Sequence, residues 1–324
     1  MTETDPPPAV PGSDAPPFTL RQLQIFLAVA DAGSFSAAAE RLLVSQTAVS
    51  LAVTELERVL RTTLLVRRRA QGVQLTTAGR SVLPLARTVL RHSGALYEQA
   101  AGAGELRGTV SLGCFPSLGP SLLPGLLEGF LTAHPAADVR FREAPMDRLE
   151  PEVLSGSLDL ALTFDVGLHP DLERTRLATR HPGVLLPAEH PAARASGPLD
   201  LRTLAQEPFI SLDTPLSSQH VDGMFRAAGI VPRVRYRSES FETVRSLVGR
   251  GFGWAVTVQR SGTDRTHEGR RVVVREIVPA QAEPVAVVAA WSAAVPLSRT
   301  ARAFVDLARS APLDEQDPRS PRHG

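Results

Sequence analysis

The sequence predicts a multidomain chain in which a mainly helical unit is followed by one long helix and then by an α/β module. Apolar residues recur with a helical period from Leu20 onwards, whereas strand and helix signals alternate after the break Gly102-Ala103-Gly104. The length of 324 residues is also too great for one small domain. Alternating strands and helices favour a mainly parallel sheet with helices on both faces.

Caps and turns predict three short helices in the first unit. The first helix runs from Leu20 and ends at Gly33, and either Ser34 or Ser36 can cap the second. After a tight turn, Ser45 caps the third helix. The residues of this third helix that we expect to face the core are Val49, Val53, Leu56 and Leu60.

A short hairpin and a long helix complete the first part of the chain. The basic run Arg67-Arg68-Arg69 precedes a glycine-containing turn that has strand signals on both sides. Thr76 or Thr77 then begins a helix that extends to about Ala101. Its apolar stripe is wider than the first unit can cover, so we expect it to pair with a second subunit. The residues predicted to dimerise are Val82, Leu85, Val89 and Leu96.

Composition and charge indicate a soluble protein that is not stabilised by disulfides. Hydrophobic residues make up 43% of the chain and the net charge is only +1, as in an ordinary soluble protein. The segment from Phe18 to Arg107 holds eleven arginines and six acidic residues, so a basic first part precedes a faintly acidic remainder. The single cysteine, Cys114, excludes an intramolecular disulfide.

We expect a cytoplasmic protein with no membrane partner. Residues 1–17 are rich in proline and acid, and they lack the pattern of a secretory signal. No apolar run is long enough to span a bilayer, and a lone cysteine fits a reducing compartment. Residues 1–17 and 312–324 are predicted to be disordered tails.

Three helices followed by a basic hairpin suit the reading of the DNA major groove. The outward residues near the start of the third helix offer amide and hydroxyl groups to base edges, while the arginines of the hairpin would contact phosphates. By spacing alone, the same residues could simply coat a solvated helix and a surface loop. The DNA-binding candidates are Ser34, Ser36, Ser45, Gln46, Thr47, Ser50, Thr54, Arg67, Arg68 and Arg69.

The stretch 20–83 closely resembles the amino-terminal domain of LysR-type transcriptional regulators. The matching segments are Leu20-Arg21-Gln22-Leu23, Gly33-Ser34-Phe35-Ser36-Ala37-Ala38-Ala39, Val44-Ser45-Gln46, Ala48-Val49-Ser50, Leu56-Glu57 and Val73-x-Leu75-Thr76-x-Ala78-Gly79. The resemblance implies an all-α-rich winged helix-turn-helix DNA-binding domain over residues 18–76, and a linker and dimerisation helix over residues 77–106.

The sequence departs from the family's common form at four positions. Thr47 replaces a frequent proline, Leu51 stands where an arginine often contacts DNA, Arg61 stands where a glycine is usual, and Leu65 replaces a phenylalanine. We therefore expect the operator preference to differ from that of the family average.

The remainder of the chain also resembles the family, though more loosely. This resemblance implies an α/β two-subdomain periplasmic-binding-protein-like effector domain over residues 107–311. Subdomain I would span about 107–180 and 280–311, subdomain II would span about 181–279, and a small molecule would bind between them. In open parallel sheets, ligands bind beyond the carboxyl ends of the strands, where helices begin.

Residues at such strand ends are the candidates for effector binding. They are Cys114, Ser117, Thr163, Phe164, Asp165, Ser211, Ser240, Gly251 and Trp254. Serine and threonine at these places are as often plain caps or turn formers, and Cys114 is more often a packing residue than a redox group.

The leading hypothesis is a LysR-type regulator that binds an interrupted inverted-repeat operator as a dimer or tetramer. Its partners would be double-stranded DNA, a small-molecule effector, a second copy of itself and, for an activator, RNA polymerase. We expect no catalytic residues, no metal site and no cofactor, because the chain lacks a nucleophile turn, a phosphate-binding loop and metal-ligand spacing. A binding protein or enzyme with a degenerate helical first part is the second hypothesis, and a different winged-helix family is the third.

Overall fold

A computed structural model describes residues 17–68, 72–100, 105–259 and 261–313, which form two compact units, Met1–Gly102 and Ala103–Gly324. Within these residues, the side chains of a few positions in β1, at the end of α4 and at the start of α7 are not described. No helix in the described ranges is long and apolar enough to cross a membrane. The two units are described one after the other.

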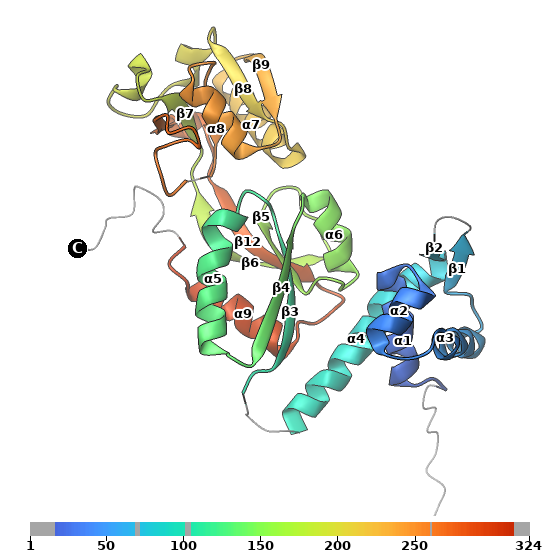
Figure 1. The fold of residues 1–324 in the computed structure, drawn as a ribbon. Coiled ribbons are helices and arrows are strands. Elements are labelled where there is room, and N and C mark those ends of the chain that lie inside the picture. Colours follow the sequence, from blue (N-terminus) through green and yellow to red (C-terminus); the bar gives the residue numbers. More distant parts are fainter. Residues whose placement is uncertain (1–16, 69–71, 101–104, 260, 314–324) are drawn as a thin grey trace, which may run out of the picture. The chain divides into compact units, whose positions relative to one another are not determined.

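The first unit contains the predicted helices and hairpin (Figure 1). Its helices are α1 (Leu20–Ala32), α2 (Phe35–Leu42), α3 (Gln46–Leu60) and α4 (Thr77–Ala100). Between α3 and α4, β1 (Leu65–Arg68) pairs antiparallel with β2 (Gly72–Leu75). The core under these elements holds the fully buried side chains of Phe26, Val29, Val49, Leu56 and Leu64.

Side-chain caps fix the start of each of the three short helices. Thr19 and Gln22 form a capping box at α1, in which the Thr19 amide donates to Gln22 Oε1 at 2.7 Å. Of the two serines that the sequence offers for α2, it is Ser34 that accepts from the backbone of the helix. Ser45 caps α3, as predicted, and accepts from the Ala48 amide at 3.1 Å.

Two of these helices end on residues other than glycine in the left-handed conformation. Leu43 after α2 has a φ of 54°, and Arg61 after α3 has a φ of 50°. This region is crowded for a residue with a Cβ atom, and glycine occupies it without that cost. Arg61 therefore has a backbone conformation that favours glycine, the residue that the resemblance to LysR-type regulators implies is usual at this position.

The start of α4 is held tightly against the segment that joins α3 to β1. The Thr76 amide donates to the Leu64 carbonyl at 2.9 Å, and Glu57 Oε1 accepts from the Leu64 and Leu65 amides. At Gly79 a Cβ atom would lie 2.1 Å from the Leu64 carbonyl oxygen. Farther along α4, the buried Arg87 guanidinium lies 2.5 Å from the Asp31 carboxylate at the end of α1.

The second unit begins with a five-stranded sheet in the order β4-β3-β5-β12-β6. Helices α5 and α9 pack on one face of this sheet, and α6 packs on the other (Figure 1). The strands are β3 (Gly108–Cys114), β4 (Ala137–Glu143), β5 (Leu160–Phe164), β6 (Leu172–Arg180) and β12 (Val285–Ser292). The helices are α5 (Gly119–Ala133), α6 (Met146–Leu154) and α9 (Arg299–Ser310).

Between β6 and β12 the chain builds a second layered part. Strands β10 and β11 pair with β7, and β8 pairs with β9. A bridge between Phe209 and Trp254 joins the two groups. The strands are β7 (Gly183–Pro187), β8 (Pro208–Leu212), β9 (Arg233–Ser238), β10 (Ala255–Thr257) and β11 (Val272–Glu276), covered by α7 (Pro215–Ala228) and α8 (Phe241–Gly249). Short 3₁₀ helices span Pro191–Ala193, Leu201–Leu204 and Pro279–Gln281.

The prediction of a mainly parallel sheet is wrong, because the sheets are mixed. Strand β12 runs antiparallel to both β5 and β6, while β3 runs parallel to β4 and β5. The physical reason is that β12 enters the first sheet directly from the second part of the module, without the crossover helix that parallel neighbours need.

One residue of the predicted carboxyl-terminal tail is part of the core. Leu313 is buried, and its carbonyl accepts a hydrogen bond from Arg180 at 3.0 Å. The rest of that tail, from residue 314, and residues 1–16 lie outside the described ranges.

The close approach at Gly79 predicts a specific loss of stability. Gly79→Ala should lower the free energy of unfolding of the first unit by about 1–3 kcal/mol, because its methyl group would collide with the Leu64 carbonyl. Gly94→Ala on the same helix is the control: its Cβ meets nothing within 4 Å, and it should be neutral or slightly stabilising. Urea unfolding of both variants measures the difference. Equal stabilities would contradict the described contact.

Candidate functional site

The outward face of α3 presents the polar side chains that the sequence singled out. Gln46, Thr47 and Thr54 are exposed, and Ser50 is half-buried. The Ser36 hydroxyl on α2 donates to Gln46 Oε1 at 3.2 Å, so the two helices share a polar contact beside the first turn of α3. This face offers hydroxyl and amide groups of the kind that read base edges.

The remaining DNA-binding candidates have other positions. The hydroxyls of Ser34 and Ser45 cap α2 and α3, which places them at the amino ends of these helices. Arg67 and Arg68 lie in β1, but their side chains are not described, and Arg69 falls outside the described residues. Leu51, on the outward side of α3, is 66% exposed.

The apolar candidates on α4 fall into two groups. Val82 is half-buried and packs against the core of the first unit. Leu85, Val89 and Leu96 are 63%, 40% and 71% exposed. Their spacing puts these three side chains on one side of the helix, where they form an apolar row that the described part of the first unit leaves uncovered.

The second unit contains two neighbouring cavities with a shared wall. The outer cavity has a volume of about 480 Å³, within the range of small-molecule sites. Its lining comes from the β3–α5 turn, the first turn of α5, α8 and the segment after β10: Pro116, Ser117, Pro120, Ser121, Phe241, Glu242, Arg245, Gln259, Ser261 and Gly262. The inner cavity is about 30 Å³, and Ser117 and Gln259 line both.

The inner cavity is mainly apolar. Its aliphatic and aromatic wall consists of Phe164, Val166, Leu212, Val221, Val256, Val258 and Val285. Its polar groups are Ser117, Ser217, His220, Thr257 and Gln259. Burial lowers the pKa of His220, an effect that the nearby Glu283 partly opposes, so the imidazole is held in its neutral form near pH 7.

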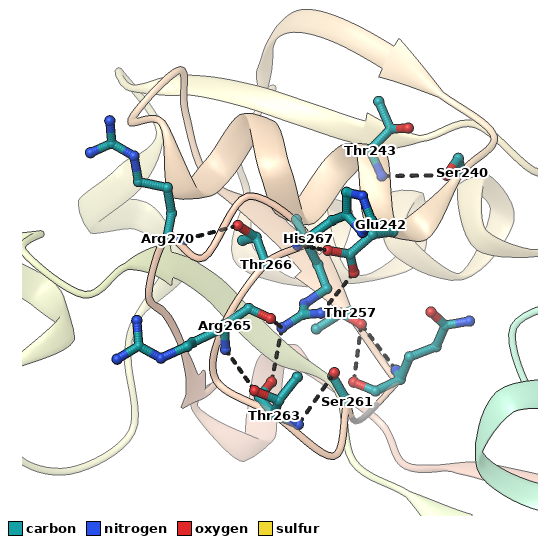
Figure 2. A network of polar contacts seen from close by, with 12 residues as sticks. Ser240, Glu242, Thr243, Thr257, Ser261, Thr263, Arg265, Thr266, His267 and Arg270 are labelled. Atoms are coloured by element: carbon teal, nitrogen blue, oxygen red, sulfur yellow. Dashed lines mark hydrogen bonds and ion pairs between the residues drawn. The ribbon is translucent and has the colours of Figure 1, made fainter.

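A polar network holds the wall of the outer cavity (Figure 2). The Glu242 carboxylate accepts from Arg245 at 2.7 Å and from the His267 amide at 2.6 Å. The buried Arg245 guanidinium also donates to the carbonyls of Thr263 and Arg265. The positive charge of Arg245 is thus paired with Glu242, and its N–H groups bind the loop after β10.

Of the predicted effector-binding residues, Ser117 and Phe164 line the cavities. Cys114, Thr163 and Ser211 lie inside strands close to them and are buried. Asp165 is paired with Arg174, at 3.1 Å.

The other three predicted residues have structural roles. Trp254 is 1% exposed in the core under α7, and its indole N–H donates to the carbonyls of Leu204 and Glu207. Ser240 caps α8 through the Thr243 amide. Gly251 has a φ of 76° in the turn after α8, which requires glycine.

Sequence reasoning missed His220, Arg245 and Gln259. None of the three belongs to a motif, and each reaches a cavity only because distant segments fold together. The one available signal was the position of Gln259 just after an apolar strand, Ala255–Thr257, which is where ligand-binding side chains often follow a strand.

Known families and structures share this organisation. Residues 20–80 match the family described as bacterial regulatory helix-turn-helix proteins of the lysR family, and residues 103–312 match the LysR substrate binding domain. The HTH-type transcriptional regulator AlsR of Bacillus subtilis is 30% identical over 244 residues, which are 72% of this chain and 78% of AlsR.

Two solved structures are similar, one to the carboxyl-terminal part of the chain and the other to most of the chain. The C-terminal domain of a probable LysR family transcriptional regulator from a Rhodococcus species is 44% identical, with a TM-score of 0.61, covering 63% of this chain and 99% of that one. Full-length CbnR in complex with its target DNA is 25% identical, with a TM-score of 0.54, covering 90% and 99%.

The position of Cys114 predicts an unreactive thiol. Burial, with a smaller contribution from Glu143, raises the pKa of Cys114 to about 12, so the reactive thiolate is scarce at neutral pH. Iodoacetamide at pH 8 should label the folded protein far more slowly than the urea-unfolded protein, as measured by mass spectrometry. Rapid, complete labelling of the folded protein would restore a redox role for this residue.

Proposed function

This chain belongs to the LysR family of DNA-binding transcription regulators, and from that premise we propose how it recognises DNA and what controls it. The protein binds an interrupted inverted-repeat operator as a dimer or tetramer in the cytoplasm. A small molecule in the cavities of the effector domain changes that binding. The family consists of regulators and not of enzymes.

The exposed polar face of α3 supports the assignment of the reading helix. In a helix-turn-helix, residues near the start of the second helix meet base edges in the major groove. Gln46 and Thr47 lie in the first turn of α3, next to the capping serine. Because Leu51 supplies no charge, Thr47 and Ser50 carry more of the base contacts in this proposal. Arg67, Arg68 and Arg69 of the hairpin contact phosphates, which position the domain.

The exposed apolar row of α4 supports the oligomer. Leu85, Val89 and Leu96 together present an apolar surface that a soluble chain normally covers with a partner. A second copy related by a two-fold axis covers it with the same residues, and Val82 continues the row toward the domain core. Such a dimer presents two reading helices, which require two half-sites. If the protein activates transcription, RNA polymerase is its further partner.

The shared wall of the two cavities supports the location of the effector. Ser117 lies between β3 and α5 and lines both cavities. Phe164 and Gln259 come from segments far away in the sequence. A ligand that contacts all three side chains changes the relative stability of closed and open arrangements of this module. That change couples effector binding to DNA binding.

An electrophoretic shift assay tests the DNA-binding part of the proposal. The purified protein should shift the region upstream of its own gene, with an affinity that falls steeply as salt rises. No salt-sensitive shift of any promoter-proximal fragment would contradict it.

A variant in the first turn of α3 tests the assignment of the reading helix. Thr47→Ala should weaken specific binding by about 1–3 kcal/mol and leave the thermal stability unchanged, since its side chain is exposed. Thr132→Ala, which removes an exposed hydroxyl from α5 of the other unit, is the matched control. If both variants bind the operator like the unaltered protein, Thr47 does not read bases.

A variant in the shared wall tests the effector site. Ser117→Ala should shift the dose–response of the target promoter to higher effector concentration. A reporter gene measures this response under the growth condition that changes transcription from that promoter. The expected change is about fivefold, as for one lost hydrogen bond of about 1 kcal/mol. Ser196→Ala, at an exposed serine away from both cavities, is the control. An unaltered dose–response for Ser117→Ala would remove this residue from the site.

A further inference from the structure

Gln259 has a buried amide group without a hydrogen-bond partner. The residue is 7% exposed, and neither Oε1 nor Nε2 has a partner among the described residues. Both atoms belong to the side chain that lines the two cavities. A buried donor and a buried acceptor left unpaired are costly, and native proteins rarely keep both on one side chain.

Two hydrogen bonds fix the backbone of Gln259. The Gln259 amide N–H donates to Thr257 Oγ1 at 3.0 Å, and the Thr257 hydroxyl donates to the Gln259 carbonyl at 3.2 Å. These contacts of Thr257 are drawn in Figure 2. Thr257 itself is 5% exposed at the end of β10. These bonds fix the backbone from which the side chain extends, and the side-chain amide is left for another group.

A second side chain with an unpaired polar atom lines the same cavity. His220 Nε2 is buried and lacks a partner in the described part of the chain. The lowered pKa keeps this imidazole neutral, so it offers a hydrogen bond and not a charge. The other walls are mainly apolar. Two side chains of the described lining of the inner cavity, those of Gln259 and His220, thus carry unpaired hydrogen-bonding atoms and no formal charge.

The charges around the outer cavity do not favour an anion. Arg245 is already paired with Glu242. The carboxylate of Glu143 lies against the start of α5, since a Cβ atom at Gly119 would be 1.9 Å from its Oε1. An anion approaching Ser117 at this helix start would meet a carboxylate that is already there.

From this geometry we propose that the effector is an uncharged molecule with an amide-like head and an apolar body. The head has a hydrogen-bond donor beside an acceptor and pairs with Oε1 and Nε2 of Gln259. The inner cavity of 30 Å³ has room for about two water-sized groups, which suits such a small head. The body lies in the outer cavity of about 480 Å³, against Phe241 and Pro120.

Hydrogen-bond matching separates this class from its charged analogues. A primary amide places a donor opposite Oε1 and an acceptor opposite Nε2, as two amides do when they pair. A carboxylate presents two acceptors, one of which faces Oε1, and an ammonium presents donors alone. Each therefore leaves one atom of Gln259 unpaired and also brings a charge into a mainly apolar cavity. This inference rests on the proposed effector site.

Thermal unfolding of the full-length protein with three matched probes tests the proposal. The probes are benzamide, benzoate and benzylamine, which share a ring and differ in the charge of the head. Benzamide should raise the Tm in proportion to ln(1 + [benzamide]/Kd), by roughly 3 °C at about ten times its Kd. Benzoate and benzylamine should not raise the Tm. No rise with benzamide, or an equal or larger rise with benzoate, would overturn the proposal.

Variants of two glutamines show whether the amide is the group that binds. Gln259→Met keeps the length of the side chain and removes both polar atoms, so benzamide should bind it at least tenfold more weakly. Gln206→Leu, at an exposed glutamine outside both cavities, should bind benzamide like the unaltered protein. Undiminished binding to Gln259→Met would overturn the proposal. If that variant does not fold, the comparison of benzamide with benzoate on the unaltered protein still tests the proposal.

The same preparation separates this inference from the function on which it rests. The operator shift is measured on the unaltered protein without any probe. A protein that shifts its operator but ignores benzamide contradicts the amide-like effector alone. A protein that binds no operator fragment contradicts the proposed function itself, whatever the probes do.

Discussion

The antiparallel pairing of β6 with β12 is the contact on which the effector domain depends. Arg180 is paired with Val285, so the chain leaves the first sheet and returns to it at one place. Everything between these residues forms the second part of the module. Both cavities lie where the two parts face each other, and their walls combine side chains from both. A single pair of strands thus fixes which distant residues can share a ligand.

Local chemistry made the first unit predictable from the sequence. Caps act over three residues, so Ser45 and Gly33 mark helix ends without any knowledge of the fold. The requirement for glycine at position 79 is different, because it comes from the carbonyl of Leu64 across the hairpin. Only the resemblance to a family indicated that this glycine mattered. Arg61 shows the reverse case: the family comparison marked it as unusual, and its positive φ gives the reason.

The place of the two cavities was predictable, but most of their lining was not. The rule that ligands lie beyond strand ends led to Ser117 and Phe164, which line the cavities. That an effector binds there stays a prediction. The same rule also selected Trp254 and Thr163, which are buried and line neither cavity, since a sequence does not show which side of a strand faces a ligand. Gln259 and His220 were missed because the unpaired state of a side chain depends on neighbours from other segments. The direction of β12 was missed because a strand reached without a helix carries no local sign of it.

The first and last parts of the effector domain meet at one hydrogen bond. The Thr300 hydroxyl at the start of α9 donates to the Arg107 carbonyl just before β3, at 2.7 Å. The other end of α9 reaches the opposite end of the sheet, where the Leu313 carbonyl accepts a hydrogen bond from Arg180 in β6. Arg180 is also the residue at which the chain crosses to the second part of the module. A fluorescent protein fused directly after Leu313 would therefore be attached beside this crossing, where it would report closure of the module in a living cell without any promoter.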